Sequence, residues 1–282
     1  MKITKAVETI LSHYNYENPE VQANLARILM HGKLGGTGRM LVLPVDQGFE
    51  HGPVRSFAVN PDAYDPSYHY KLAIDAGMSA YAAPLGFLEA GSVEFAGKIP
   101  TILKLNSSNS LMPKDTSPDQ AITATVKDAL RLGCAAVGLT IYPGSPKFLR
   151  MLEEVREIAR EAKENGLAVI IWSYPRGGDL SKDGETAIDI CAYAAHMAAL
   201  MGANIIKVKP PTDFIEQSEA KKVYESEKID ISSLEARVRH INDACFAGKR
   251  LVLFSGGVTK SDAELLDEVT AIKKGGASGC II

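Results

Sequence analysis

The chain has 282 residues, 46% of them hydrophobic, and its 31 lysines and arginines stand against 34 aspartates and glutamates, for a formal net charge of −3. This near-neutral balance excludes a nucleic-acid clamp, which needs a basic excess on one face, and the apolar content excludes a disordered chain. No apolar run approaches the roughly 18 residues of a membrane helix. The first twenty residues lack the continuous apolar core of a signal peptide, so we expect a cytoplasmic protein without nucleic-acid or membrane partners.

The cysteines do not indicate a metal site. Cys134, Cys191, Cys245 and Cys280 lie far apart, each in apolar surroundings, and the sequence contains no CxxC motif or Cys/His cluster. Such spacing is typical of reduced thiols in the core of a cytosolic protein. We therefore predict no bound metal.

Short apolar runs recur along the chain, and helical patterns separate them. The runs are MLVLPV (40–45), SAYAAP (79–84), TILKL (101–105), AAVGLTIY (135–142), LAVIIW (167–172), NIIKVK (204–209), RLVLF (250–254) and SGCII (278–282). Runs that are apolar throughout, rather than at alternate positions, are typical of parallel strands buried on both faces. The sequence thus predicts eight buried strands.

Helix start signals lie between these runs. Asp65-Pro66 supplies an N-cap and a proline at the first helical position. Residues 117–120 (SPDQ) match a capping box and predict a helix that buries Ile122, Val126 and Leu130. Two further capping boxes pair Ser232 with Glu235 and Ser261 with Glu264.

Eightfold alternation of strand and helix favours an α/β fold of the (β/α)8 TIM-barrel type over an open sheet. The first strand is followed by residues 46–52 (DQGFEHG) rather than by the GxGxxG turn of a dinucleotide-binding sheet. We expect residues 1–39 to form extra N-terminal helices and residues 40–282 to form a single barrel domain. Residues 210–231 are a polar insertion after the sixth strand, either an active-site lid or a solvated surface loop.

The chain stops at Ile282, on the eighth predicted strand. A closed barrel needs a helix after that strand to cover its apolar outer face. We therefore expect the natural protein to continue beyond this residue.

Lysines at the ends of two strands are the strongest sign of chemistry. Functional residues of such barrels gather at the C-terminal strand ends, where Lys207 and Lys209 follow Ile206 and Val208, and Lys104 lies in the third strand. Burial and a second cation both lower the pKa of an amine, which makes it nucleophilic near neutral pH, as a Schiff-base lysine must be. The alternative is that these lysines pair with carboxylates.

Other strand ends carry groups suited to acid–base chemistry and anion binding. Tyr174 can move protons, although core packing would also explain it, and Arg176 can hold a phosphate through two hydrogen bonds. Asp46 can orient a substrate hydroxyl or stabilise a cation, or it can simply cap a turn. His51 alone is more typical of a loop.

The seventh strand ends in Ser255-Gly256-Gly257. Consecutive glycines let backbone N–H groups approach a phosphate, and the loops after strands seven and eight are the usual phosphate site of this fold.

Together these stretches resemble the archaeal-type class I fructose-bisphosphate aldolases, a family also found in bacteria. The resemblance rests on LPVDQGFEHGP (43–53), ILKLN (102–106), GLTIYPGS (138–145), VIIWSYPRGG (169–178), GANIIKVK (202–209) and LFSGG (253–257). It implies a homo-oligomeric lyase that uses neither metal nor cofactor and cleaves fructose 1,6-bisphosphate into dihydroxyacetone phosphate and glyceraldehyde 3-phosphate, a reaction of glycolysis and gluconeogenesis.

The resemblance also implies roles for individual residues. Lys207 matches the Schiff-base lysine, Tyr174 the acid/base tyrosine and Asp46 the substrate-contacting aspartate. Substrate-binding positions match Trp172, His51, Arg176, Lys104, Lys209, Ser255, Gly256 and Gly257. The family also binds the proximal phosphate with a Gly-Arg beyond strand eight, and this chain has none.

Two other functions compete with this one. A related Schiff-base transaldolase or acyl-transfer enzyme would use the same lysine on another phosphorylated sugar. A non-catalytic phosphate-binding barrel would hold Lys207 in a salt bridge, whereas catalysis requires an unpaired amine beside Tyr174.

Overall fold

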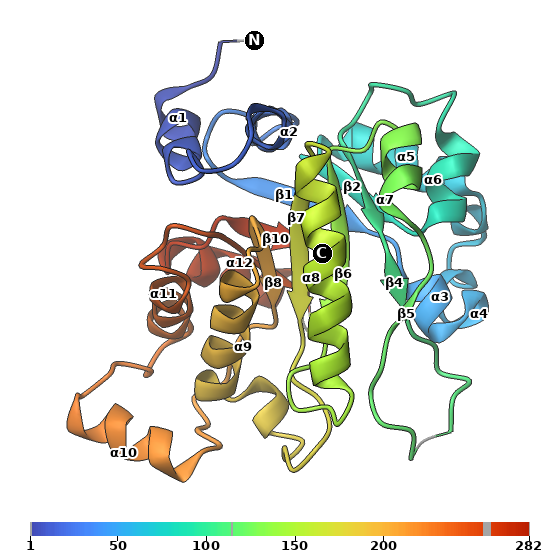
Figure 1. Cartoon of the computed structure of the whole chain (residues 1–282). Helices are drawn as coiled ribbons and strands as arrows, with labels where there is room; N and C mark the ends of the chain where they lie inside the picture. Colours follow the sequence, from blue (N-terminus) through green and yellow to red (C-terminus); the bar gives the residue numbers. More distant parts are fainter. Residues whose placement is uncertain (1, 114, 256–260, 282) are drawn as a thin grey trace.

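A computed structural model of the chain describes residues 2–113, 115–255 and 261–281. Within these ranges, eight parallel strands close into a barrel in the order β1-β10-β9-β8-β7-β6-β3-β2 (Figure 1). The barrel strands are β1 (Met40–Pro44), β2 (Ala80–Ala83), β3 (Thr101–Lys104), β6 (Ala136–Ile141), β7 (Ala168–Ser173), β8 (Ile205–Val208), β9 (Leu251–Ser255) and β10 (Gly279–Ile281). Each coincides with a predicted apolar run, with β7 and β9 extending one residue beyond theirs, so the (β/α)8 prediction is confirmed.

Helices surround the barrel and precede it. They are α1 (Lys5–Ser12), α2 (Pro19–Leu29), α3 (Gln47–His51), α4 (Pro53–Phe57), α5 (Pro66–Ala76), α6 (Leu85–Gly91), α7 (Val126–Arg131), α8 (Phe148–Glu164), α9 (Ile188–Leu200), α10 (Ser218–Ser226), α11 (Leu234–Ala244) and α12 (Asp262–Lys274), with 3-10 turns at Pro61–Tyr64 and Gly184–Thr186. Among the described helices, none is long and apolar enough to cross a membrane.

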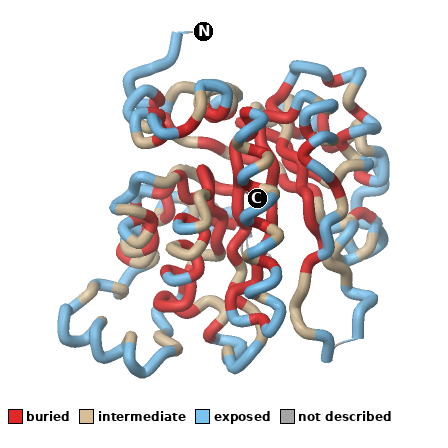
Figure 2. The backbone as a smooth tube through the Cα atoms, viewed as in Figure 1, coloured by how far each residue is buried: buried red, intermediate tan, exposed pale blue. Residues whose placement is uncertain are grey.

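The strands bury both faces, as their sequences predict, and Figure 2 shows them as a continuous buried band. One apolar cluster fills the barrel interior, where Ile170 of β7 is level with Ile205 of β8, and Ile205 with Leu251 of β9. A second cluster lies between the outer faces of the strands and the helices. Because successive side chains of a strand point to opposite faces, residues two positions beyond this interior layer face the barrel mouth.

The N-terminal helices seal the end of the barrel where the strands begin. Val7 and Leu11 of α1, with Leu25 of α2, belong to the interior cluster. The buried hydroxyl of Tyr14, between the two helices, donates to the carbonyl of Asn204 at 2.6 Å and accepts from the N–H of Leu251 at 3.0 Å. This single group therefore ties the N-terminal segment to the starts of β8 and β9.

The predicted helix start at residues 117–120 is wrong. This segment runs without regular structure into β5 (Ala121–Ile122), which pairs antiparallel with β4 (Asn106–Ser107). Ile122 is consequently exposed rather than buried. Helix α7 begins later because Thr125 and Asp128 form the capping box that is actually used.

The two later capping predictions have different outcomes. Ser261 and Glu264 form the predicted box at α12. At α11 the N-cap is Ser233, one residue later than predicted, because the hydroxyl of Ser232 bonds to the carboxylate of Asp230 instead.

The polar insertion is anchored at its start and solvated beyond it. The carboxylate of Glu216 accepts from the backbone N–H of Ser181 at 2.8 Å, and the carboxylate of Asp189 accepts from the N–H groups of Glu216 and Gln217. Helix α10 buries no residue of its own and protrudes from the molecule (Figure 1). Tyr224 connects it to α11 through His240 Nε2 at 2.7 Å. Whether the insertion is a lid or a solvated loop stays a prediction.

Candidate active site

Lys207 lies at the mouth of the barrel. It is two residues after Ile205 on β8, so its side chain faces the interior, and only 6% of the residue is exposed. Its register partner on β7 is Trp172. The amine Nζ lies 5.6 Å from a Trp172 ring centroid and 5.5 Å from that of Tyr174. The amine is thus enclosed by aromatic surface.

This amine is unpaired among the described residues, since no carboxylate there lies within 4.0 Å of it and it has no hydrogen-bond partner. Burial lowers the pKa of Lys207 to about 8, although Asp46 and then Glu50 act to raise it. An appreciable share of the amine is therefore neutral, and nucleophilic, just below pH 8. The salt-bridge alternative is not what the described residues show.

Tyr174 lies beside this amine. It directly follows β7, and its ring packs against the interior cluster. Burial raises the pKa of its phenol, the charge of Asp46 raises it further, and a hydrogen bond with the side chain of Ser255 acts to lower it. The phenol accordingly keeps its proton at neutral pH and can donate it to a developing negative charge.

Asp46 follows β1 and begins α3. It occupies the N-cap position of α3, as the capping alternative predicts, but its side chain makes no capping hydrogen bond. Its charge acts instead on the buried amines of Lys104 and Lys207 and on the phenol of Tyr174. The carboxylate is therefore free to interact with a molecule bound at the mouth of the barrel.

Sequence reasoning missed Glu50. It lies four residues after Asp46 on α3, one helical turn on, and its N–H bonds to the Asp46 carbonyl at 3.2 Å. Burial and then Asp46 raise the pKa of Glu50, whereas Lys104, His51 and Arg176 lower it. The i, i+4 spacing within DQGFE was the available signal, because it places both carboxylates on one side of a helix.

Lys104 is a second buried amine at the mouth. Its residue is 2% exposed, and Nζ lies 5.7 Å from a Trp172 ring centroid. The amine donates to the backbone carbonyl and the side-chain oxygen of Asn106. Asn106, also missed from the sequence, is held by two hydrogen bonds to the backbone of Thr140 on β6. Burial lowers the pKa of Lys104, Asp46 and Glu50 raise it, and Lys207 lowers it further.

The remaining predicted residues surround this centre at different depths. Lys209 lies 3.8 Å from the carboxylate of Glu185, and its Nζ is 6.0 Å from the Tyr174 ring. The guanidinium of Arg176 stacks over Tyr142 at 5.2 Å. His51 is half-exposed, 4.0 Å from Glu50. Ser255 ends β9 and is buried, while Gly256 and Gly257 lie outside the described residues.

Trp172 forms the floor of the mouth, and one glycine makes room for it. A Cβ on Gly138 of β6 would lie 2.0 Å from the indole Cζ3, so a side chain there would displace the ring. The buried indole N–H has no acceptor among the described residues.

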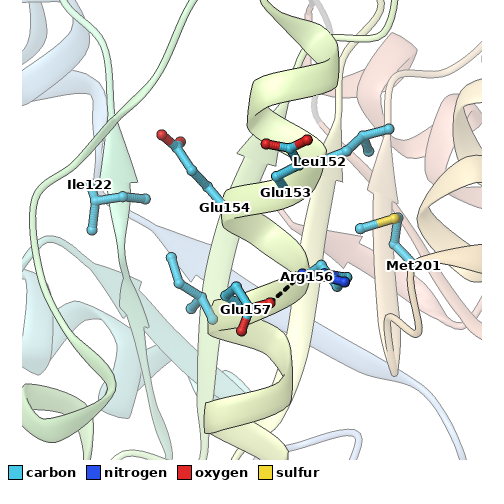
Figure 3. Close-up of a pocket in the computed structure, with 8 residues that line it drawn as sticks. Ile122, Leu152, Glu153, Glu154, Arg156, Glu157 and Met201 are labelled. Atoms are coloured by element: carbon cyan, nitrogen blue, oxygen red, sulfur yellow. Dashed lines mark hydrogen bonds and ion pairs between the residues drawn. The ribbon is translucent and has the colours of Figure 1, made fainter.

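Among the described residues, the centre around Lys207 is distinct from two other kinds of site, a metal-ligand cluster and a surface cavity. Within the described ranges, no group of three or more His, Cys, Asp or Glu residues is placed to hold a metal ion. A hollow of about 790 Å³ on the outer face of α8 is lined by Ile122, Leu152, Ile158 and Met201 together with charged residues (Figure 3). It contains none of the groups around Lys207.

Residues 40–282, from the first barrel strand onward, match the family described as DeoC/LacD family aldolase. The chain belongs to this aldolase family. Its probable class 1 fructose-bisphosphate aldolase relative from Chlamydia muridarum is 35% identical, over 94% of this chain and 78% of that protein. The class 1 fructose-bisphosphate aldolase of Thermoproteus tenax is 37% identical, over 87% and 82%.

Solved aldolase structures of the family share the fold as well as the sequence. An archaeal fructose-1,6-bisphosphate aldolase, solved with its catalytic lysine bound to the carbinolamine intermediate of the substrate, is 33% identical. It matches 92% of this chain and 90% of its own, with a TM-score of 0.75. This DeoC/LacD family member therefore shares its barrel fold with an enzyme solved with its catalytic lysine covalently bound to an intermediate.

Proposed function

We propose that this protein is a class I, Schiff-base fructose-bisphosphate aldolase, a lyase that cleaves fructose 1,6-bisphosphate into dihydroxyacetone phosphate and glyceraldehyde 3-phosphate. The observation that carries the proposal is the buried, unpaired amine of Lys207, which lies against the ring of Tyr174. A non-catalytic phosphate-binding barrel would have no need to leave a buried amine without a carboxylate partner, because burying an unpaired cation is costly.

The first half of the reaction uses the neutral amine. Lys207 Nζ attacks the C2 carbonyl of the open-chain sugar, and the resulting carbinolamine loses water to give a protonated imine. The phenol of Tyr174 gives up one net proton as the carbonyl oxygen becomes water, because the imine that forms is itself protonated. The carboxylate of Asp46 stabilises the positive imine, as it already stabilises the charged form of Lys207.

The second half breaks the carbon–carbon bond. The oxygen of Tyr174, deprotonated when the water of imine formation left, takes the proton of the C4 hydroxyl, which becomes the aldehyde of glyceraldehyde 3-phosphate, while the C3–C4 electron pair moves onto C3 and neutralises the iminium as an enamine. A proton then adds at C3, and water hydrolyses the imine. Dihydroxyacetone phosphate leaves and the Lys207 amine is restored, so the route needs neither a metal nor a cofactor.

Cations around the mouth suit a substrate that is anionic at both ends. Arg176 and His51 are our candidates for the distal phosphate, and Ser255 with the adjoining glycines for the proximal one. Lys104 and Lys209 add positive charge near the sugar, and the ring of Trp172 lies beside the amines of Lys104 and Lys207. Anchoring both ends positions the C3–C4 bond for cleavage, since binding energy from remote groups serves orientation.

The cellular setting belongs to the same proposal. A fructose-bisphosphate aldolase acts in glycolysis and gluconeogenesis, so we place the protein in the cytoplasm. We further propose that it works as a homo-oligomer. Sedimentation of the full-length protein would check this assembly.

Borohydride trapping tests the proposal. The protein is incubated with dihydroxyacetone phosphate, reduced, digested and analysed by mass spectrometry for the modified lysine. We expect one adduct, on Lys207, and a loss of cleavage activity of at least about 10⁴-fold in Lys207→Met. Lys209→Met is the matched control, because its lysine follows two residues later and is paired with Glu185.

The outcomes separate the alternatives. An adduct on Lys104 or Lys209 would retain imine chemistry but overturn the choice of residue. No adduct on any lysine of folded protein would overturn the aldolase proposal. An adduct on Lys207 without cleavage of fructose 1,6-bisphosphate would instead point to another phosphorylated sugar.

A further inference from the structure

A cationic pocket lies at the opposite end of the barrel from Lys207. Its volume is about 220 Å³, and it is formed where α1 meets the chain just before β1, β9 and β10. Four of its lining residues are basic, namely His13, Arg39, Lys249 and Arg250. None of the described residues that line it is acidic. In a chain with more carboxylates than lysines and arginines, such a pocket is a concentration of positive charge.

The cations of this pocket are not neutralised by neighbours. Within the described ranges, no carboxylate lies within 4.0 Å of Arg39, Lys249 or Arg250. Glu17, whose charge acts on Tyr14 as does that of Arg250, is held by Lys163 at 2.5 Å and by Asn204 at 2.7 Å. The pocket therefore has a net positive charge that a bound anion would balance.

Arg250 is held in place but keeps donors free. Its guanidinium carbon lies 4.8 Å from the ring centroid of Phe246 and 5.4 Å from those of Tyr14 and Tyr16. One terminal N–H bonds to the carbonyl of Lys249 at 2.9 Å. Its Nε is buried and has no acceptor among the described residues. Because this Nε is enclosed by protein, the donors that a bound anion can reach belong to the terminal nitrogens of Arg250, of which only one has a partner among the described residues.

The second guanidinium is also positioned from the barrel. Arg39 directly precedes β1 and donates one N–H to the carbonyl of Ala277, just before β10. Its remaining donors are available to the pocket. Two guanidinium groups fixed by the fold, with a lysine and a histidine at the rim, form the donor set that recognises the oxygens of a phosphate.

We propose that this pocket binds the phosphate group of a small phosphorylated molecule, or free phosphate, at a site separate from the one around Lys207. The volume suits a small metabolite rather than a nucleotide or a peptide. His13 lies at the end of α1, whereas Arg39 and Arg250 lie next to the first residues of barrel strands. A phosphate bound between them therefore joins the N-terminal helices to the barrel. Binding is therefore expected to stabilise their packing.

His13 provides a local reporter for the test. Inorganic phosphate, and separately glycerol phosphate, is titrated into the full-length protein at constant ionic strength while the imidazole resonance of His13 is followed by NMR. His13→Gln assigns that resonance. We expect a saturable shift with phosphate but not with chloride. Inorganic phosphate and glycerol phosphate distinguish a free ion from a phosphorylated metabolite by their relative affinities.

Variants decide whether this pocket is responsible. Arg39→Gln and Lys249→Gln should each weaken binding about tenfold, the loss of one charge-assisted hydrogen bond. Lys5→Gln, an exposed change on α1 outside the pocket, and Arg176→Gln at the mouth should leave the His13 titration unchanged. Lys249 is exposed, so its variant keeps the test valid even where Arg39→Gln fails to fold.

Two results would overturn the proposal. One is a His13 shift that does not saturate or that chloride reproduces, which would indicate general charge screening. The other is a saturable shift that Lys249→Gln leaves unchanged and Arg176→Gln abolishes, which would assign all phosphate binding to the mouth.

Discussion

The two ends of the barrel solve the problem of buried polar groups in opposite ways. At the end where the strands begin, the hydroxyl of Tyr14 satisfies two strand backbones, and apolar side chains from α1 and α2 pack against the barrel interior beside the cationic pocket. At the end where the strands finish, the amine of Lys207 is buried and left without an ion-pair partner among the described residues. One end is arranged for stability and the other for reactivity.

One fold can thus keep the residues that stabilise it apart from the residues that react. Desolvating Lys207 costs free energy, and that cost is what makes its amine nucleophilic near neutral pH. The sealed end lies at the opposite face of the barrel, so its hydrogen bonds contribute stability without touching the reacting groups. Substitutions at the two ends should accordingly affect different measurements.

The largest effect is expected for Tyr174→Phe. Removing the phenol hydroxyl takes away the proposed proton donor and should lower kcat by about 10²- to 10⁴-fold. Because Lys207 is untouched, dihydroxyacetone phosphate should still be trapped on it by borohydride. Tyr193→Phe, at an exposed position, is the control. Near-normal kcat in Tyr174→Phe would rule out this role.

A smaller effect, of a different kind, is expected for Tyr14→Phe. Leaving the N–H of Leu251 and the carbonyl of Asn204 without their buried partner should lower the free energy of unfolding by about 1–3 kcal/mol. Urea denaturation measures it, and kcat should stay unchanged. Tyr16→Phe is the matched control, because that side chain is exposed and keeps its ring contacts with Arg250. A fall in kcat without a loss of stability would contradict the separation of the two ends.

The smallest effect is a displacement of the pH profile. Imine formation needs the neutral amine, so kcat/KM should rise with pH through about 8, the pKa of Lys207. The charges of Asp46 and Glu50 raise this pKa, with Asp46 the stronger. Asp46→Asn and Glu50→Gln should therefore move the midpoint to lower pH, the former further. Glu50→Asp, which keeps the charge, should move it least; a midpoint displaced to higher pH would refute the assignment.

The strand ends of the barrel were predictable because their signal is local. Continuous apolar runs require burial on both faces, and the eightfold alternation of strand and helix leaves few topologies other than the barrel. The alternation of side chains along a strand then predicts which face Lys207, Trp172 and Tyr174 take. Glu50 and Asn106 were missed, because the i, i+4 spacing of Asp46 and Glu50 becomes informative only once α3 is known to be a helix, and Asn106 has no comparable local signal. Glu50 reaches the mouth only because α3 forms, and Asn106 only because β4 pairs with β5.

The alternation of apolar runs with helical patterns is a property of the sequence alone. It was enough to predict the fold and the strand ends at which the candidate catalytic residues lie. Tertiary structure alone decided which groups are paired. The segment at 117–120 carries a helix start signal, yet it has no regular structure and leads into β5, which pairs with β4. Lys209 has a carboxylate partner in Glu185, while Lys207 has none among the described residues. Pairing depends on distances between residues far apart in the chain, and these exist only once the barrel has closed.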